Sequence, residues 1–284
     1  MNKLLAANFM RLKKSFLFWG CIVFMAGFAL LLQVFNYFDI QEFNAQKVDY
    51  DPAGVFGSDA MVFATFVGIV GAVFISLFTG TEYSDGTIRN KVVIGHRRRD
   101  IYFSNLITGI FTGICVDLAY LAVYFVTGPV FIGDCFGFSV SALLVQLLTV
   151  VVLTAALGSV FTLISMLNHN KAASAVVCVL LAFALLFAGS YTNSRLSEPE
   201  YLPEYYVDEN GAVQQGEPEK NPRYLTGTKR QVYQFANDFL PGGQQIQMAA
   251  GGTPKPWTLM GYSGVIVLIS TAGGIVAFRR KDLR

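Results

Sequence analysis

Residues 138–167 read FSVSALLVQLLTVVVLTAALGSVFTLISML and contain no charged side chain. An α-helix rises about 1.5 Å per residue, so roughly 20 apolar residues are enough to cross about 30 Å of hydrocarbon. A run of this length and polarity predicts a helix that crosses a membrane. The fold is therefore expected to form in lipid rather than in water.

The rest of the chain repeats this pattern. Hydrophobic residues make up 54% of it and charged residues only 14%, whereas soluble domains have about 25% charged residues. Of six predicted spans, only the third has a charge in its interior, Asp117. The five besides 138–167 are 16–38, 60–80, 101–126, 172–191 and 257–278. The predicted fold class is an all-α integral membrane protein with six transmembrane helices.

Lysines and arginines in the short loops predict the orientation of these spans. With six spans, the basic residues of four segments fall on one side of the membrane. They are Lys3, Arg11, Lys13 and Lys14; Arg89, Lys91, Arg97, Arg98 and Arg99; Lys171; and Arg279, Arg280, Lys281 and Arg284. The loops 39–59 and 127–137, on the other side, contain Lys47 as their single basic residue. Because cytoplasmic loops are enriched in Lys and Arg, both termini are expected to be cytoplasmic.

A short amphipathic helix is predicted ahead of the first span. Its apolar residues recur at steps of four, three and four: Leu5, Phe9, Leu12 and Phe16. This spacing puts them on one helical face with Arg11 and Lys14 opposite, as in a helix lying on the cytoplasmic membrane surface. The first apolar run exceeds the core of a signal peptide, about 7–15 residues. An uncleaved span is therefore favoured over a cleaved signal.

The segment 192–256 differs from the spans because it contains seven of the nine prolines, and it is expected to be external. Within it, residues 205–208 and 212–214 flank Glu209-Asn210-Gly211. Asn-Gly suits the positive φ angles of a tight turn, so the pattern predicts a β-hairpin.

A helix is predicted further along this segment. Thr228 is the expected cap, Val232, Phe235 and Phe239 share one face, and Pro241-Gly242-Gly243 ends the helix. Hairpin and helix together predict a small ordered external domain.

No motif for bond chemistry is found. The phosphate-binding pattern G-x-x-x-x-G-K-[ST] is absent from the sequence, so any ATPase is expected to be a separate chain. His96 and His169, the only histidines, fall in predicted cytoplasmic loops, which leaves no H-E-x-x-H and no intramembrane serine–histidine pair. The four cysteines lie in or beside apolar runs without metal-ligand spacing. We expect no catalytic residue, no metal and no cofactor bound by this chain.

The loop 81–100, after the second span, has the most specific pattern. Gly86 and Gly95 bracket a segment that can form two helical turns, with Ile88 and Val92 on one face and charged residues elsewhere. A short helix of this kind is suited to docking in a groove of a soluble partner. The alternative is a solvated loop whose positive charges only fix the topology.

This loop and the chain ends resemble one known family. An interfacial basic helix is followed by E-Y-x-x-G-T-I-R-N-K at 82–91, R-x-x-I-Y at 98–102 and F-R-R-K-D-L at 278–283. This order resembles the permease subunits of type-2 ATP-binding-cassette (ABC) transporters over essentially the whole chain. The stretch 221–244 resembles permeases of Gram-positive bacteria.

The resemblance implies partners and a set of coupling residues. Two permease subunits, identical or related, would lie in the bacterial plasma membrane with two cytoplasmic ABC ATPase subunits, which would bind ATP and Mg²⁺. In that family the loop after the second span carries the coupling helix. The residues to which this role passes here are Glu82, Gly86, Thr87, Ile88, Arg89, Lys91, Val92 and Gly95.

The expected organisation has three parts. Residues 1–191 hold the interfacial helix, spans one to five and the coupling loop 81–100; residues 192–256 form the external insertion; residues 257–284 form the sixth span and a cytoplasmic tail. The insertion departs from the minimal pattern of the family.

Asp117 is a separate candidate site. A charge near the bilayer centre costs about 2.5–3.5 kcal/mol on insertion scales and marks a functional site by default. Asp117 is therefore an intramembrane polar candidate for a direct role toward substrate or ion. The alternatives are a protonated carboxyl bonded to a neighbouring helix, or a shifted span that brings Asp117 nearer the interface.

The expected function is ATP-driven export, and the spans are compatible with a peptide, drug, lipid or ion as substrate. A proton-coupled secondary transporter using Asp117 is the leading alternative, and it would work without an ATPase. Against it, no second ionisable residue lies within the predicted spans to complete a relay. A membrane sensor whose external domain binds a ligand is the third class.

Overall fold

The computed structural model describes residues 1–46, 51–133, 139–203, 205–207, 213–216, 218–251 and 253–281. Within these residues, six helices are long and apolar enough to cross a membrane. They are α2 (Phe16–Gln46), α4 (Ala64–Ser84), α6 (Arg98–Phe131), α7 (Val140–Leu167), α8 (Lys171–Ser197) and α11 (Pro256–Arg280). The six predicted spans are confirmed, and the protein is an all-α integral membrane protein.

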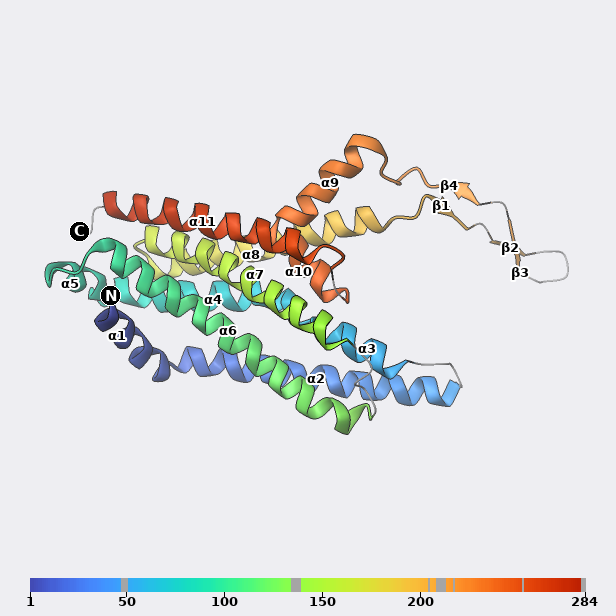
Figure 1. Cartoon of the computed structure of the whole chain (residues 1–284), viewed down its shortest axis with the longest axis horizontal. Coiled ribbons are helices and arrows are strands. Elements are labelled where there is room, and N and C mark those ends of the chain that lie inside the picture. Colours follow the sequence, from blue (N-terminus) through green and yellow to red (C-terminus); the bar gives the residue numbers. More distant parts are fainter. Residues whose placement is uncertain are drawn as a thin grey trace.

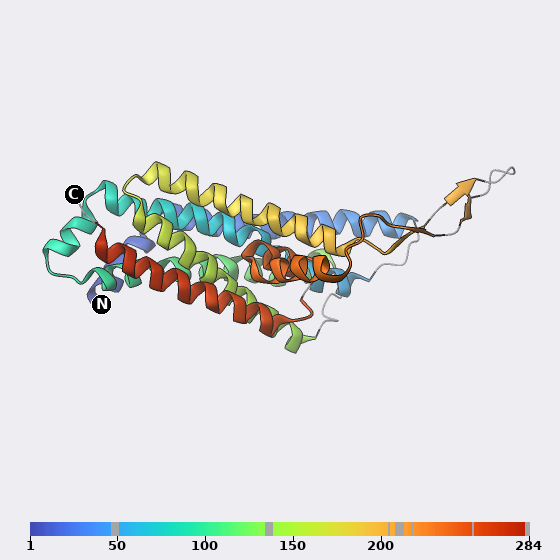
Figure 2. The same ribbon diagram turned by 90° about the horizontal axis from the view of Figure 1, so that it is seen from above.

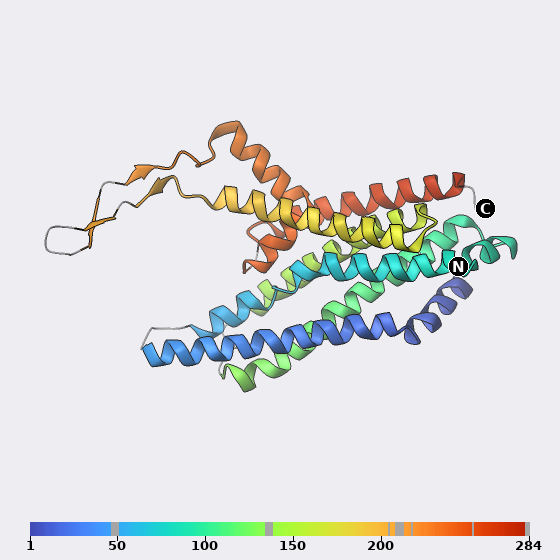
Figure 3. The same cartoon turned by 180° about the vertical axis from the view of Figure 1, so that it is seen from behind.

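The spans form one elongated bundle (Figure 1). Helix α4 is the most enclosed of the six and packs against α8, α7 and α6, while α2 packs along α6 and α11 along α7. Both termini and the short helix α5 (Thr87–Val93) lie at one end of the bundle, as Figures 1 and 3 show from opposite sides. The opposite end carries the segment between α8 and α11.

Helix α2 continues to Gln46, past the predicted end at residue 38. Asp39 ended the predicted apolar run, but a helix continues through polar residues once it leaves the hydrocarbon. The short helix α3 (Pro52–Asp59) was not predicted at all. Its Phe56 ring stacks on Tyr124 of α6 at 4.7 Å between centroids, and Tyr124 Oη donates a hydrogen bond to the Phe56 carbonyl at 3.0 Å. An aromatic contact, rather than helical periodicity, therefore holds α3 on the bundle.

The N-terminal helix α1 (Asn2–Lys13) confirms that a helix precedes the first span, but its predicted apolar face is wrong in part. The buried residues are Leu4, Asn8 and Leu12. Phe16 belongs to α2 and is 92% exposed. Polar partners inside the bundle, which the spacing of apolar residues does not reveal, turn the Asn8 side of α1 inward.

The predicted hairpin is present as β2 (Tyr205–Val207) paired antiparallel with β3 (Val213–Gln215), in a register that sets Val207 opposite Val213. The turn Glu209-Asn210-Gly211 lies outside the described residues. A second antiparallel pair joins β1 (Tyr201–Leu202) to β4 (Glu219–Lys220). Figure 2 shows these strands as a narrow arm that extends beyond the bundle.

The predicted helix of the insertion is present as α9 (Gly227–Phe239), whose N-cap is Thr226 rather than Thr228. Pro241-Gly242-Gly243 ends α9 but also begins another helix, α10 (Pro241–Ala249). Proline suits the first turn of a helix, where its missing N–H has no intrahelical acceptor.

Helix α10 is inserted into the end of the bundle, against α8, α4, α9 and α7. Gln245 Nε2 donates a hydrogen bond to the Ala64 carbonyl of α4 at 2.9 Å, and Ser263 Oγ of α11 donates to Gln244 Oε1 at 2.7 Å. Gly242 lies so close to α8 that a Cβ there would overlap the Leu185 carbonyl. Close backbone approach through small residues is typical of helix packing in membranes.

Candidate functional site

Two glycines set the ends of α5. Gly86, its N-cap, has φ +66°, and Gly95, two residues beyond its end, has φ +96°. Both lie in the left-handed region, where glycine carries no steric penalty. The prediction that Gly86 and Gly95 bracket a segment of two helical turns is confirmed, and the helix begins at Thr87.

Glu82, near the end of α4, holds α5 to the bundle. Its side chain is fully buried, and its Oε1 accepts hydrogen bonds from Lys91 Nζ of α5 and, at 2.7 Å, from Arg11 Nη1 of α1. Asn105 Nδ2 of α6 donates to Glu82 Oε2 at 2.9 Å. One buried carboxylate thus joins four helices, and both of its oxygens are occupied.

Asn8 extends this network. Its Nδ2 donates to Asn105 Oδ1 at 2.9 Å, and its Oδ1 accepts from Lys91 Nζ at 3.3 Å. Arg11 also donates to the Phe78 carbonyl at 3.0 Å, and its guanidinium carbon lies 3.6 Å from the centre of the Phe78 ring. Burial lowers the pKa of the Arg11 guanidinium, while the charge of Glu82 opposes that shift. We call Asn8, Arg11, Glu82, Lys91 and Asn105 the coupling network.

The apolar side of α5 differs from the prediction. Ile88 is only 1% exposed and belongs to a buried cluster with Tyr102, Met166 and Phe278. Val92 is partly buried against the same cluster. Ile88 and Val92 were expected to enter a groove of the ATPase partner, but Ile88 already packs within its own chain. A coupling role for Val92 stays a prediction.

The outward face of this region contains other residues. Val93 and Ile94 are 77% and 78% exposed, and Arg89 is also exposed. The segment has apolar residues on both sides, so spacing alone did not distinguish the face that packs inward from the face that is free.

A second cluster fixes the end of α11 beside α5. Lys281 Nζ donates to Tyr83 Oη and to the Met166 carbonyl, each at 2.9 Å, and burial lowers the pKa of this ammonium to about 8. Arg98 donates to the carbonyls of Phe278 and Arg279 at 3.2 and 3.1 Å. Arg98, which the sequence marked as a topology signal and as part of the R-x-x-I-Y motif, thus also has a structural role.

A family model described as ABC-2 family transporter protein matches residues 4–188. The chain belongs to the ABC-2 family. The match runs from α1 into α8 and includes every residue of the coupling network. No protein in the curated set matches the chain. As an ABC-2 permease, the chain is a multi-pass transport subunit, and its family implies association with ABC ATPase partners.

Asp117 of this ABC-2 permease lies in α6 and is 4% exposed. Its Oδ2 accepts a hydrogen bond from Thr154 Oγ1 of α7 at 2.8 Å. A cavity of about 20 Å³ beside it, also lined by Phe74 and Thr112, has room for one water. The carboxyl therefore has a partner on a neighbouring helix, as one of the alternatives expected. A direct role toward substrate or ion stays a prediction.

Sequence reasoning missed three members of the coupling network. Arg11 was counted as a topology signal and as part of the polar face of the predicted interfacial helix, and Asn8 and Asn105 carried no signal at all. Arg11 and Glu82 are 71 positions apart, so only the fold brings them together. Glu82 and Lys91 were both predicted as coupling residues, and the structure places them in direct contact.

Proposed function

We propose that this ABC-2 permease forms the translocation path of an ATP-driven exporter in the plasma membrane of a Gram-positive bacterium. Its partners are a second permease subunit, identical or related, and two cytoplasmic ABC ATPase subunits that bind ATP and Mg²⁺. The observation that supports this proposal is the Glu82 carboxylate, which ties α5 to α1, α4 and α6.

In this mechanism ATP binding draws the ATPase subunits together and displaces α5. Because Lys91 and Arg11 share one buried carboxylate with Asn105, a shift of α5 moves α1 and the ends of α4 and α6 with it. Packed helices change between discrete arrangements rather than deforming continuously. The spans then open a path between the two permease subunits toward the opposite side. No residue of this chain performs bond chemistry.

The docking face in this proposal is the exposed pair Val93 and Ile94, with Arg89 beside it. Two adjacent apolar side chains at the end of a short helix suit a groove on a soluble partner, and a neighbouring cation adds orientation. Lys91 and Glu82 act behind this face, and Gly86 and Gly95 fix its position.

Replacing both Val93 and Ile94 with Asp is expected to lower ATPase binding and substrate-stimulated ATP hydrolysis by about tenfold or more. Each carboxylate would be desolvated at the contact, at a cost of several kcal/mol unless it stays wet. Copurification and hydrolysis by the complex in nanodiscs measure the effect. The pair V93S/I94S, which removes the apolar contact without adding charge, should give an intermediate loss. Normal ATPase binding and normal hydrolysis with V93D/I94D would mean that this loop only fixes the topology.

The proposed orientation has a separate test in whole cells. In a chain freed of its natural cysteines, Tyr201→Cys on the arm should react with a membrane-impermeant thiol reagent, whereas Arg97→Cys beside α5 should not. Tyr201 is 53% exposed and Arg97 is also exposed, so access to the sulfur is assured at both sites. The opposite labelling pattern would show that the protein has the inverted orientation in the membrane.

A further inference from the structure

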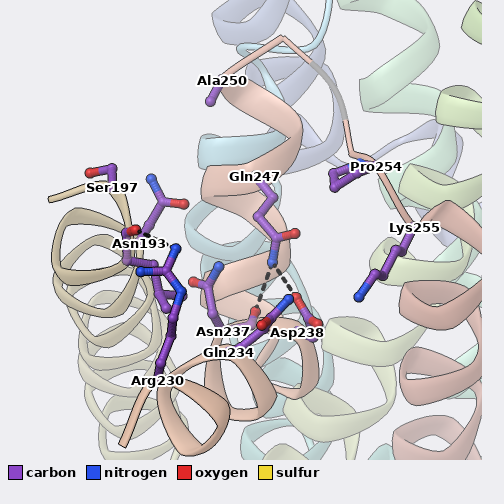
Figure 4. Close-up of a pocket in the computed structure, with 11 residues that line it drawn as sticks. Asn193, Ser197, Arg230, Gln234, Asn237, Asp238, Gln247, Ala250, Pro254 and Lys255 are labelled. Carbon is purple, nitrogen blue, oxygen red and sulfur yellow. Dashed lines mark hydrogen bonds between the residues drawn. The ribbon is translucent and has the colours of Figure 1, made fainter. Parts of the chain in front are cut away.

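A polar pocket lies at the end of the bundle away from the coupling network, between α8, α9, α10 and the start of α11 (Figure 4). Its volume is about 330 Å³. Its polar side chains are Asn193, Ser197, Arg230, Gln234, Asn237, Asp238, Gln247 and Lys255. Some of these groups form hydrogen bonds that hold α8, α9 and α10 together, but the proposed transport mechanism uses none of them.

Two cations and one carboxylate line this pocket. Arg230 reaches only the carbonyls of Leu196 and Leu225, at 3.5 Å each, and the Tyr224 ring, so it has no carboxylate partner among the described residues. Lys255 likewise forms no ion pair with any of the described residues. Asp238 does have a partner, because its Oδ1 accepts a hydrogen bond from Gln247 Nε2 at 3.1 Å. The pocket therefore has a net positive charge and two unpaired cations.

Asn237 adds an oriented donor between them. It is 4% exposed, and its Oδ1 accepts from Thr192 Oγ1 at 2.9 Å. Gln247 Nε2 donates to the Asn237 carbonyl at 3.0 Å, which fixes α10 against α9. The Asn237 Nδ2 has no acceptor within the described part of the chain and is not one of its buried unpaired atoms, so it is a donor open to the pocket. Figure 4 shows Arg230 and Lys255 on opposite sides, with Asn237, Asp238 and Gln247 between them.

We propose that this pocket binds a hydroxylated phosphate ester, either as a free solute or as the head group of an anionic lipid. A phosphate presents acceptor oxygens in several directions, which suits donors on opposite walls, and its bonds to cations are strong. The Asp238 carboxylate and the amides of Asn193 and Gln234 suit the hydroxyl groups of such a ligand. The volume lies at the small end of ligand pockets, about 300–1,000 Å³.

The bound ligand would restrain the inserted helix. Lys255 immediately precedes α11 and Gln247 belongs to α10, whereas Arg230 and Asn237 belong to α9. A ligand that contacts all three stabilises their relative positions, so binding is expected to raise the thermal unfolding temperature. This readout does not depend on transport or on the ATPase subunits.

The test uses the full-length permease in two kinds of nanodisc. In phosphatidylcholine nanodiscs, glycerol 3-phosphate is titrated by calorimetry and by thermal unfolding. In nanodiscs that contain phosphatidylglycerol, retained lipid is counted by native mass spectrometry. Saturable binding in the first arm supports a free solute, and retained phosphatidylglycerol that excludes glycerol 3-phosphate supports a head group. Binding of neither probe overturns the proposal.

Variants locate the site. Arg230→Gln and Lys255→Gln should each weaken binding about tenfold, since each loses a charge-assisted contact. Asp238→Asn keeps an acceptor for Gln247 but removes the opposing charge, so it should bind at least as tightly as the parent. Lys229→Gln is the matched control, because Lys229 is an exposed cation on α9 outside the pocket lining. Unchanged binding in R230Q and K255Q, or an equal loss in K229Q, would overturn the assignment.

Discussion

The Glu82→Leu variant is expected to unfold with a free energy about 3 kcal/mol below that of the parent. The substitution leaves Lys91 and Arg11 at a buried site without their carboxylate, and breaking a buried ion pair from one side costs about 3–5 kcal/mol. We take the low end of this free-energy range because the Arg11 side chain is 32% exposed and keeps some hydration. Chemical unfolding in mixed micelles measures the change.

A second substitution separates the ion pair from simple packing. In Glu82→Leu/Lys91→Met, the more buried of the two cations disappears together with its partner. The double variant is therefore expected to be more stable than E82L alone, a non-additivity that marks direct contact. The coupling network would not be the element that holds α5 in either of two cases. In one, the losses of stability measured for E82L and for Lys91→Met alone simply add in the double variant; in the other, E82L is as stable as the parent.

The Gly242→Val variant is expected to lose about 3 kcal/mol or more, and to expose α10. Any side chain at this position overlaps the Leu185 carbonyl, and because the overlapped atoms are backbone, no rotamer change relieves the clash. Thermal unfolding and limited proteolysis of the segment between α9 and α11 report the two consequences.

The matched control for this prediction is Gly261→Ala in α11. A Cβ at Gly261 meets no atom within 4 Å, so the change adds only helix propensity, up to about 1 kcal/mol in favour of the helix. Equal destabilisation by G242V and G261A would mean that the α8–α10 contact contributes nothing specific.

The spans were predictable because each is a long run of one chemical character. The ends of α5 were predictable because only glycine adopts the left-handed backbone there without strain. Both signals are local, so neighbouring residues contain all of the necessary information.

The inward faces of α1 and α5 were not predictable from such signals. Asn8 and Arg11 turn inward because Asn105 and Glu82, far along the chain, supply their partners. The insertion of α10 was missed for a related reason: a Pro-Gly-Gly sequence ends one helix, but only contact with Gly189 and Leu185 on α8 shows that the next helix is buried.

In the proposed transport mechanism, the contact between α1 and Glu82 also brings the lipid into coupling. Helix α1 is predicted to lie at the membrane surface, and Arg11 ties it to the same carboxylate that holds α5. The height of the proposed ATPase docking face above the bilayer would thereby be linked to the position of the lipid head groups. Because hydrophobic mismatch displaces surface and spanning segments at a modest free-energy cost per ångström, acyl-chain length becomes a variable in how efficiently ATP hydrolysis drives transport.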